Sequence, residues 1–423
     1  MRRQPVTETV EAARTARAAA AEAGPRSADS IAVTCDLIRF GVFFDGTGNS
    51  RNHAGTGDVS WHTNVDLLEQ KYETTNAPVV RRVGAERRKV NYGSIYARGI
   101  GVESGGGTTT YGMALGMGSE GVRQRVNQTI NQIRTQLRSK ASGMEVCDLW
   151  FDVFGFSRGA AAARHFANRA PVQALSVQGT QPETRFMGLY DTVVMIGPGV
   201  STSGSGDLVY VETNNSANRI VHITADNEIR ENFPLTRARG ERRYRIAGVH
   251  SDVGGGYNPN RRNDQRGSFA FEHEDYPGLP RYLRESWGLS TTNRHGADRE
   301  SPDSLISVRQ SRAQPWDAGE WRSTFNWSCH HGLQHVTLRI MFEEARAYGV
   351  PLTPWTNSIA GVDVSLSGML LEYYNALRSG RPTTELENRI RLRYSHVSFN
   401  GDRNWGFRPH LPKTDGVRHV AIR

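Results

Sequence analysis

The sequence predicts an α/β fold in which helices cover both faces of a mostly parallel sheet. Apolar runs of strand length alternate with amphipathic or Ala-rich helical segments, an order that favours parallel pairing. A serine between glycines lies where one of these runs meets a helix. The composition, with 37% hydrophobic and 22% charged residues in a chain of 423, is typical of a globular protein with a full core.

The N-terminal region is predicted to be an appendage to this fold. Residues 8–23 are rich in Ala, Glu and Arg and are followed by Gly24 and Pro25, which predicts a helix with a defined end. We therefore expect a helical appendage over residues 1–30 and a single α/β domain over residues 31–423.

The domain begins with a strand that feeds a glycine loop. Residues 37–44 form a β-rich run that ends in the DGTGN loop of residues 45–49. Residues 93–112 are expected to form a second glycine-rich loop. Residues 122–137 follow it, with apolar residues at helical spacing.

The remaining elements continue the alternation of strands and helices. Residues 146–154 (VCDLWFDVF) predict a buried strand, and the Ala-rich residues 160–170 predict the helix after it. Further strands are expected at residues 185–190 and 244–249, and a further helix at residues 332–348. No internal repeat is apparent.

The serine between the strand and the Ala-rich helix is the most informative residue. Residues 155–159 read Gly-Phe-Ser-Arg-Gly, a match to Gly-X-Ser-X-Gly. In a nucleophile elbow the serine has a strained backbone on a tight strand-to-helix turn, so its neighbours two positions away must be small. Gly155 and Gly159 meet that need, and Ser157 is the candidate nucleophile of an α/β-hydrolase-type fold.

A serine hydroxyl needs a base, and the base needs a carboxylate that orients it. In this fold the carboxylate and the histidine follow the serine in chain order, each after a strand. Asp191 follows the apolar run ending at Tyr190, and His250 follows the run ending at Val249. His396, near the end of the chain, is the rival base.

Attack on an ester also requires two donors for the oxyanion. The first is the N–H of the residue after the nucleophile, here Arg158. The second is expected from the loop after residue 44, with Gly46 or Thr47 as the donor because glycine permits close approach of the backbone.

The formal net charge is +9, and Lys71, Lys89, Lys140 and Lys413 are the only lysines. The many arginines lie in small scattered groups, which does not favour nucleic acid as a partner and suits solvated faces or an anionic lipid surface better. No apolar run is long enough to cross a bilayer, and the N-terminus lacks the apolar region of a secretory signal.

The cysteines do not predict a disulfide or a metal site. Cys35, Cys147 and Cys329 are widely spaced and odd in number, so we expect three buried or inert thiols.

Three other motifs carry weaker signals. The DGT sequence at 45–47 has Phe43 where a phosphatase of the haloacid-dehalogenase type needs a second aspartate, and residues 116–121 match a dinucleotide fingerprint without a preceding strand. His331 and His335 have helical spacing, but Gly332 replaces the glutamate of a zinc-protease helix. We therefore expect neither a metal nor a cofactor.

Four motifs together resemble a known family. They are FFDGTGN (43–49), VFGFSRGAAAARHFAN (153–168), GLYDTV (188–193) and AGVHSDVGGGY (247–257). They are similar to the domain of unknown function 2235, whose characterised members are the first family of type VI secretion lipase effectors. The resemblance spans residues 37–348 and places the family's catalytic serine, aspartate and histidine on Ser157, Asp191 and His250.

That resemblance implies an antibacterial phospholipase of A1 or A2 type with an α/β-hydrolase fold. It implies a phospholipid membrane as substrate, a cognate immunity protein and a secretion spike protein as partners, and delivery from the producer's cytoplasm into the periplasm of a rival cell. The chain looks shorter than many members of the family, which carry additional membrane-attachment modules. A broad-specificity esterase and a non-catalytic interaction module are the alternatives.

Residues 257–326 form a polar region that interrupts the predicted domain. It contains Trp287, Trp316, Trp321 and Phe325, and tryptophan favours membrane interfaces. The region is expected to be either a lid over an acyl-binding groove or an ordinary surface insertion.

Overall fold

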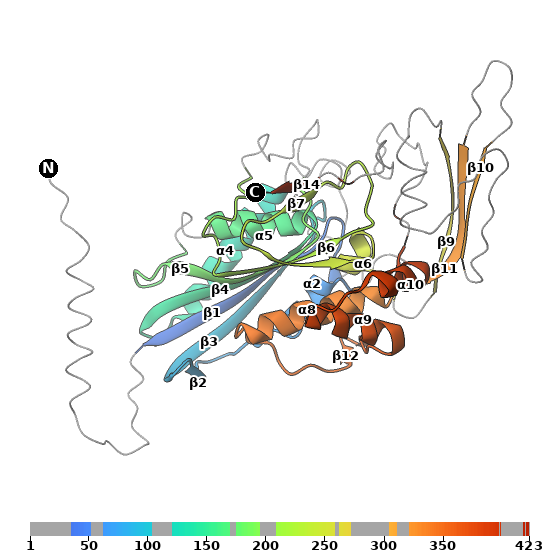
Figure 1. Cartoon of the computed structure of the whole chain (residues 1–423). Coiled ribbons are helices and arrows are strands. Elements are labelled where there is room, and N and C mark those ends of the chain that lie inside the picture. Colours follow the sequence, from blue (N-terminus) through green and yellow to red (C-terminus); the bar gives the residue numbers. More distant parts are fainter. Residues whose placement is uncertain are drawn as a thin grey trace.

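The centre of the protein is a seven-stranded sheet, seen here in a computed structural model (Figure 1). The described residues are 35–51, 62–103, 121–169, 175–194, 209–258, 262–271, 304–310, 321–396, 398, 418 and 420–422. The strands are β1 (Asp36–Phe44), β2 (Val79–Val83), β3 (Glu86–Ala97), β4 (Val146–Phe156), β5 (Pro182–Tyr190), β6 (Arg219–Ala225) and β8 (Arg242–Ile246). Their order is β2-β3-β1-β4-β5-β6-β8, and every neighbouring pair except the β2–β3 hairpin is parallel.

Helices cover both faces of this sheet. One face carries α4 (Val122–Lys140) and α5 (Arg158–Arg169). The other face carries α2 (Asn64–Glu69), α8 (Leu333–Ala347), α9 (Gly368–Ser379) and α10 (Thr384–Tyr394). Each face has its own large cluster of buried hydrophobic residues, so the fold has the predicted three-layer α/β architecture.

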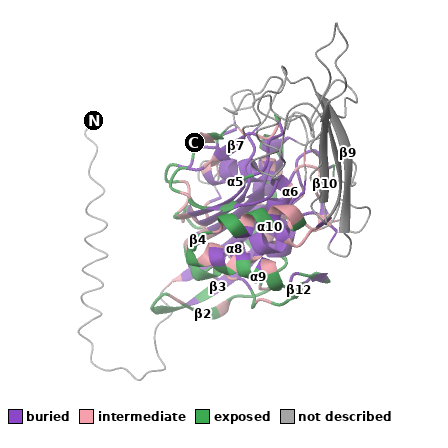
Figure 2. Cartoon of the chain, turned by 45° about the vertical axis from the view of Figure 1, so that its right-hand side comes forward, coloured by how far each residue is buried: buried purple, intermediate pink, exposed green. Residues whose placement is uncertain are grey.

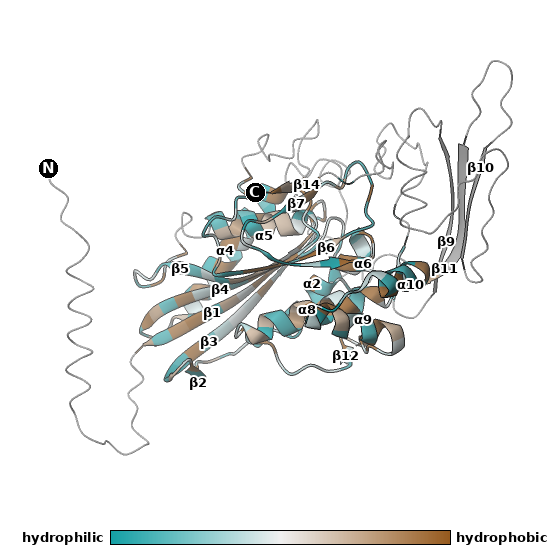
Figure 3. Cartoon of the chain, viewed as in Figure 1, coloured by the Kyte–Doolittle hydropathy of each residue, from teal (hydrophilic) through white to brown (hydrophobic). Residues whose placement is uncertain are grey.

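The helices bury the faces that their apolar residues dictate. Hydrophobic and hydrophilic residues alternate along α8, as Figure 3 shows. In α10 only Leu386 and Ile390, four residues apart, are buried, and its other side is exposed (Figure 2). No helix among the described residues is long and apolar enough to span a bilayer.

Most of the expected elements are present, with one clear correction. The runs expected at residues 37–44, 146–154, 185–190 and 244–249 are β1, β4, β5 and β8, with small differences at their ends. Gly93, however, lies inside β3 and not in a loop. It is a glycine because a Cβ there would lie 2.6 Å from the Phe40 ring.

Part of the expected insertion at residues 257–326 is a small antiparallel sheet. Its strands are β9 (Arg262–Phe271), β10 (Ser304–Gln310) and β11 (Trp321–His330), in the order β10-β11-β9. The rest of that region and the expected helix at residues 8–23 lie outside the described residues. The role of this region as a lid therefore stays a prediction.

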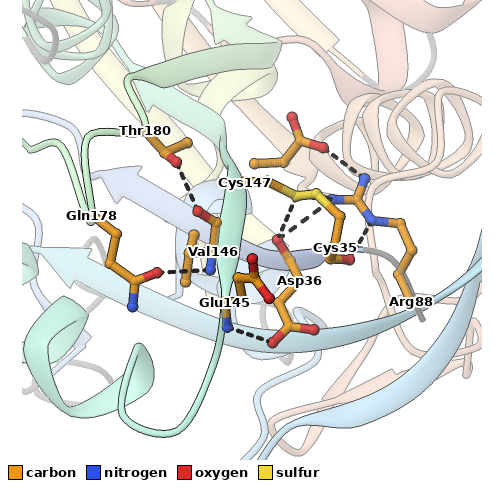
Figure 4. The surroundings of a disulfide bond; sticks show 9 residues. Cys35, Asp36, Arg88, Glu145, Val146, Cys147, Gln178 and Thr180 are labelled. Atoms are coloured by element: carbon orange, nitrogen blue, oxygen red, sulfur yellow. Dashed lines mark hydrogen bonds and ion pairs between the residues drawn. A yellow bond between two sulfur atoms is a disulfide. The ribbon is translucent and has the colours of Figure 1, made fainter. Parts of the chain in front are cut away.

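The expectation of three unpaired thiols is wrong for two of them. Cys35 and Cys147 form a disulfide with a Cα–Cα distance of 5.7 Å (Figure 4). Cys329 is a buried thiol outside any disulfide. The bridge joins the start of β1 to the start of β4, which are adjacent because Asp36 pairs with Val146. A sequence separation of 112 residues conceals this contact, which depends on the parallel register of the two strands.

Candidate active site

Ser157 lies on the tight turn between β4 and α5, as the motif predicts. Its φ is 59°, a conformation that non-glycine residues seldom adopt and that costs on the order of 1–3 kcal/mol. Its carbonyl oxygen accepts hydrogen bonds from Ala160 and Ala161 and so begins the helix. The turn therefore holds the serine at the carboxyl edge of the sheet, where it is 4% exposed.

Both flanking glycines are required by close backbone contacts. A Cβ on Gly155 would lie 2.4 Å from the carbonyl oxygen of Gly159, and a Cβ on Gly159 would lie 2.2 Å from that of Asp45. The start of α5 is therefore pressed against the end of β1. This is the local reason for the glycine at each end of the pentapeptide.

Asp191 follows β5, the strand next to the elbow. Phe156 pairs in register with Tyr190, so Ser157 and Asp191 both follow neighbouring strand ends. Asp191 also has a positive φ, of 41°, and is fully buried. Two strained residues at adjacent strand ends are typical of a functional site.

His250 is the first residue of α6 (His250–Gly254), and its ring contacts Asp191. The His250 Nδ1 lies 2.6 Å from Asp191 Oδ2. The His250 ring lies 4.7 Å from the ring of Phe156, the residue before the serine, and 4.9 Å from that of Phe233. A neutral ring that donates from Nδ1 carries its lone pair on Nε2, the nitrogen a serine hydroxyl needs.

The His250 ring packs against Phe156, the residue that precedes the serine. Among the described residues, the structure gives no hydrogen bond between the Ser157 hydroxyl and the His250 ring. Contacts of this kind often tighten only when substrate binds.

Burial sets the protonation of this pair. It lowers the pKa of His250 below its ordinary value of 6.5, against the opposing effect of Asp191. Burial alone would raise the pKa of Asp191, but Arg418 and His250 hold that pKa well below its usual range. The pair at neutral pH is therefore an aspartate beside a neutral imidazole.

His396, the rival base, belongs to a different cluster. Its Nδ1 lies 2.5 Å from Asp252 Oδ1, and its ring stacks on Tyr257 with a centroid distance of 3.8 Å. Its Nδ1 is also 3.7 Å from the thiol of Cys329. Asp252 in turn accepts from the N–H of Val249, so this cluster fixes the start of α6.

The candidate oxyanion loop lies against the elbow. The Arg158 Nε donates to Thr47 Oγ1 at 2.9 Å, which ties the first residue of α5 to the loop after β1. The Gly46 N–H already donates to Asp45 Oδ1 at 2.7 Å, whereas no acceptor for the Thr47 N–H lies among the described residues. Of the two donors proposed from sequence, the geometry favours Thr47 over Gly46.

A buried carboxylate holds that loop in place. Asp45 accepts hydrogen bonds from Thr63 Oγ1, the Tyr96 hydroxyl and the Gly46 N–H. Burial raises the pKa of Asp45 to about 6, against the hydrogen bond from Tyr96. Asp45 therefore fixes the start of the loop by accepting these three hydrogen bonds.

Two residues near the His250–Asp191 pair were not predicted from the sequence. Glu228, after β6, accepts the backbone N–H of His250 at 3.3 Å and is held by Arg230. Burial acts to raise the pKa of Glu228, but Arg230 brings it to about 2. Its place after a strand is a signal that could have found it. Arg418, which contacts Asp191, has no such signal.

Comparison with known proteins supports the fold. No family model and no curated protein matches the sequence. Among solved structures, the chain is similar to the Tle1 effector bound to the VgrG spike from the type VI secretion system. Their TM-score is 0.62 at 21% identity, over 95% of this chain and 99% of that one. This likeness confirms the α/β-hydrolase-type fold and agrees with the resemblance drawn from the four motifs.

Two further structures match less closely. One is an uncharacterized protein from Pseudomonas aeruginosa, with a TM-score of 0.48 and 18% identity over 84% of this chain and 53% of that one. The other is a ferulic acid esterase from Streptomyces cinnamoneus, with a TM-score of 0.19 and 14% identity over 55% and 56%.

Proposed function

We propose that this protein is a serine hydrolase of carboxylic esters, and specifically a phospholipase A that is delivered by a type VI secretion system. Ser157 is the nucleophile, His250 the general base and Asp191 the residue that orients it. The observation that carries the proposal is the 2.6 Å contact between His250 and Asp191, beside a strained serine at the next strand end.

The reaction follows from these positions. As Ser157 Oγ attacks the acyl carbonyl, His250 Nε2 takes its proton, and Asp191 stabilises the resulting imidazolium. His250 then gives the proton to the departing lysolipid alcohol, which leaves an acyl-enzyme ester on Ser157. Water activated by the same histidine releases the fatty acid and restores the serine.

The oxyanion of both steps needs backbone donors. The N–H groups of Arg158 and Thr47 supply them, because the Arg158–Thr47 contact brings the elbow and the loop after β1 together. Each such donor contributes about 3–4 kcal/mol to stabilisation of the transition state.

The proposed substrate and partners are inferred from the similarity of this chain to type VI secretion effectors. The fold is shared with the Tle1 effector, which was solved bound to a VgrG spike, so a spike protein is the proposed carrier of this chain. The motif resemblance adds a phospholipid substrate in the target-cell periplasm and a cognate immunity protein. The excess of arginine over lysine at a net charge of +9 suits phosphate head groups.

Position-labelled phospholipids test the proposed substrate. The full chain is incubated with vesicles whose two acyl chains carry different labels, and in parallel with a short-chain soluble ester. We expect one labelled fatty acid and the matching lysophospholipid as products. Turnover of the soluble ester alone would favour a broad-specificity esterase, and turnover of neither would point to a non-catalytic module.

The pH dependence of activity follows from the lowered pKa of His250. The neutral ring is the base, so activity is lost only when pH falls through that lowered pKa. We expect the acid limb of the pH profile of kcat/KM for the soluble ester to be centred below pH 6.5. An acid limb centred above pH 6.5, measured over pH 4.5 to 8, would contradict this assignment.

A further inference from the structure

We propose that Arg418 is a positioning residue of the active site, which holds Asp191 in place and sets how strongly it attracts a proton on His250. This inference rests on the proposed function. The Arg418 guanidinium forms a bidentate pair with Asp191, with NH1 2.7 Å from Oδ1 and NH2 2.8 Å from Oδ2. Its side chain is only 7% exposed.

The donors around Asp191 leave its carboxylate a single orientation. Oδ1 accepts from the N–H of Ala225 at 2.9 Å and from Arg418, and Oδ2 accepts from Arg418 and from His250 Nδ1. The two parallel N–H···O bonds of a bidentate arginine pair fix the direction of a carboxylate as well as stabilise it. Without Arg418, the donors left to the carboxylate among the described residues would be the Ala225 N–H and His250 Nδ1.

The fold brings this arginine from the far end of the chain. Residues Val420–Ile422 form β14, which pairs in parallel with β7 (Leu235–Arg237), as Figure 1 shows. Arg418 lies two residues before β14. Its Nε donates to the carbonyl oxygen of Phe233 at 2.8 Å, and its NH1 donates to that of Ala225 at 3.1 Å. The guanidinium is thus held by backbone as well as by Asp191.

The charges around the pair decide what Arg418 does to His250. Asp191 faces Nδ1, Glu228 accepts the backbone N–H, and Arg230 pairs with Glu228. Arg418 pairs with both oxygens of Asp191, including Oδ2, which also contacts the imidazole, and so offsets the negative charge that His250 meets. If Arg418 were removed, the full charge of Asp191 would act on His250 and favour the imidazolium.

A structural ion pair and a positioning residue differ in their effect on pH dependence. Arg418→Gln, Arg418→Lys and the control Arg245→Gln are compared in the full chain with a soluble ester. Arg245 pairs with Asp226 at 2.8 Å in the same region, but it is 63% exposed. For Arg418→Gln we expect kcat to fall about 10- to 100-fold. We also expect the acid limb of the pH profile of kcat/KM to move up by about one pH unit. Arg418→Lys keeps the positive charge, so its acid limb should lie at the wild-type pH, but its kcat should stay below that of wild type.

Several outcomes would overturn the inference. A folded Arg418→Gln variant with the wild-type kcat and acid limb would reduce Arg418 to an anchor for the C-terminal strand. If Arg418→Gln does not fold, a folded Arg418→Lys variant with unchanged kcat would lead to the same conclusion. Ser157→Ala is measured alongside: if it is as active as wild type, the proposed function fails, whereas an inactive Ser157→Ala with an unaltered Arg418→Gln refutes the inference alone.

Discussion

Replacing Ser157 by alanine is expected to lower kcat for ester hydrolysis on the order of 10⁴- to 10⁶-fold, as removal of a serine nucleophile does in other triad enzymes. The change deletes one buried oxygen and leaves the backbone turn intact, since alanine tolerates the φ of 59° about as well as serine does. The oxyanion donors and the rest of the site remain. The loss should therefore appear in kcat, with the melting temperature almost unchanged.

The measurement is fatty-acid release by wild type, Ser157→Ala and a matched serine control. Ser139→Ala serves as the control because Ser139 is exposed near the end of α4, on an outer helix of the sheet. Its activity should equal that of wild type. Activity of Ser157→Ala within tenfold of wild type would exclude Ser157 as the nucleophile.

Replacing His250 by alanine should cause a loss of similar size, whereas His396→Ala should act on stability. The change removes the proposed base, so the residual rate comes from the oxyanion donors and binding. His396 pairs with Asp252 and stacks on Tyr257 away from Asp191, so its removal costs a buried hydrogen bond, on the order of 1–3 kcal/mol.

The two variants are compared by kcat and by thermal unfolding in the same buffer. His250→Ala should be folded and inactive, and His396→Ala should melt at a lower temperature with kcat close to wild type while folded. An active His250→Ala together with a folded but inactive His396→Ala would transfer the role of base to His396.

The sequence was sufficient to place the residues of the candidate site whose positions depend on local structure. Ser157, Asp191 and His250 each follow an apolar run, and parallel strands bring such positions to one edge of a sheet. The elbow was predictable because a side chain on either of its glycines would clash with nearby backbone, and the motif that shows this is five residues long. Local patterns of this kind can be interpreted without knowledge of the tertiary contacts.

What the sequence did not yield depends on contacts between distant segments. The Cys35–Cys147 disulfide requires the register of β1 against β4, and Arg418 reaches Asp191 from 227 residues away. Gly93 looked like part of a loop because its partner, the Phe40 ring, belongs to another strand. Likewise, Thr47 is favoured over Gly46 as an oxyanion donor because the Gly46 N–H donates to Asp45 Oδ1, and the sequence does not show that contact.

The most direct test of the account is to find which residue a fluorophosphonate labels. Such a reagent reacts covalently with a serine that a neighbouring base activates. After labelling of the full chain and proteolysis, mass spectrometry should place one adduct on Ser157, and His250→Ala should lose it. An adduct on another residue, or none on Ser157 in a preparation that hydrolyses phospholipid, would contradict the proposed mechanism.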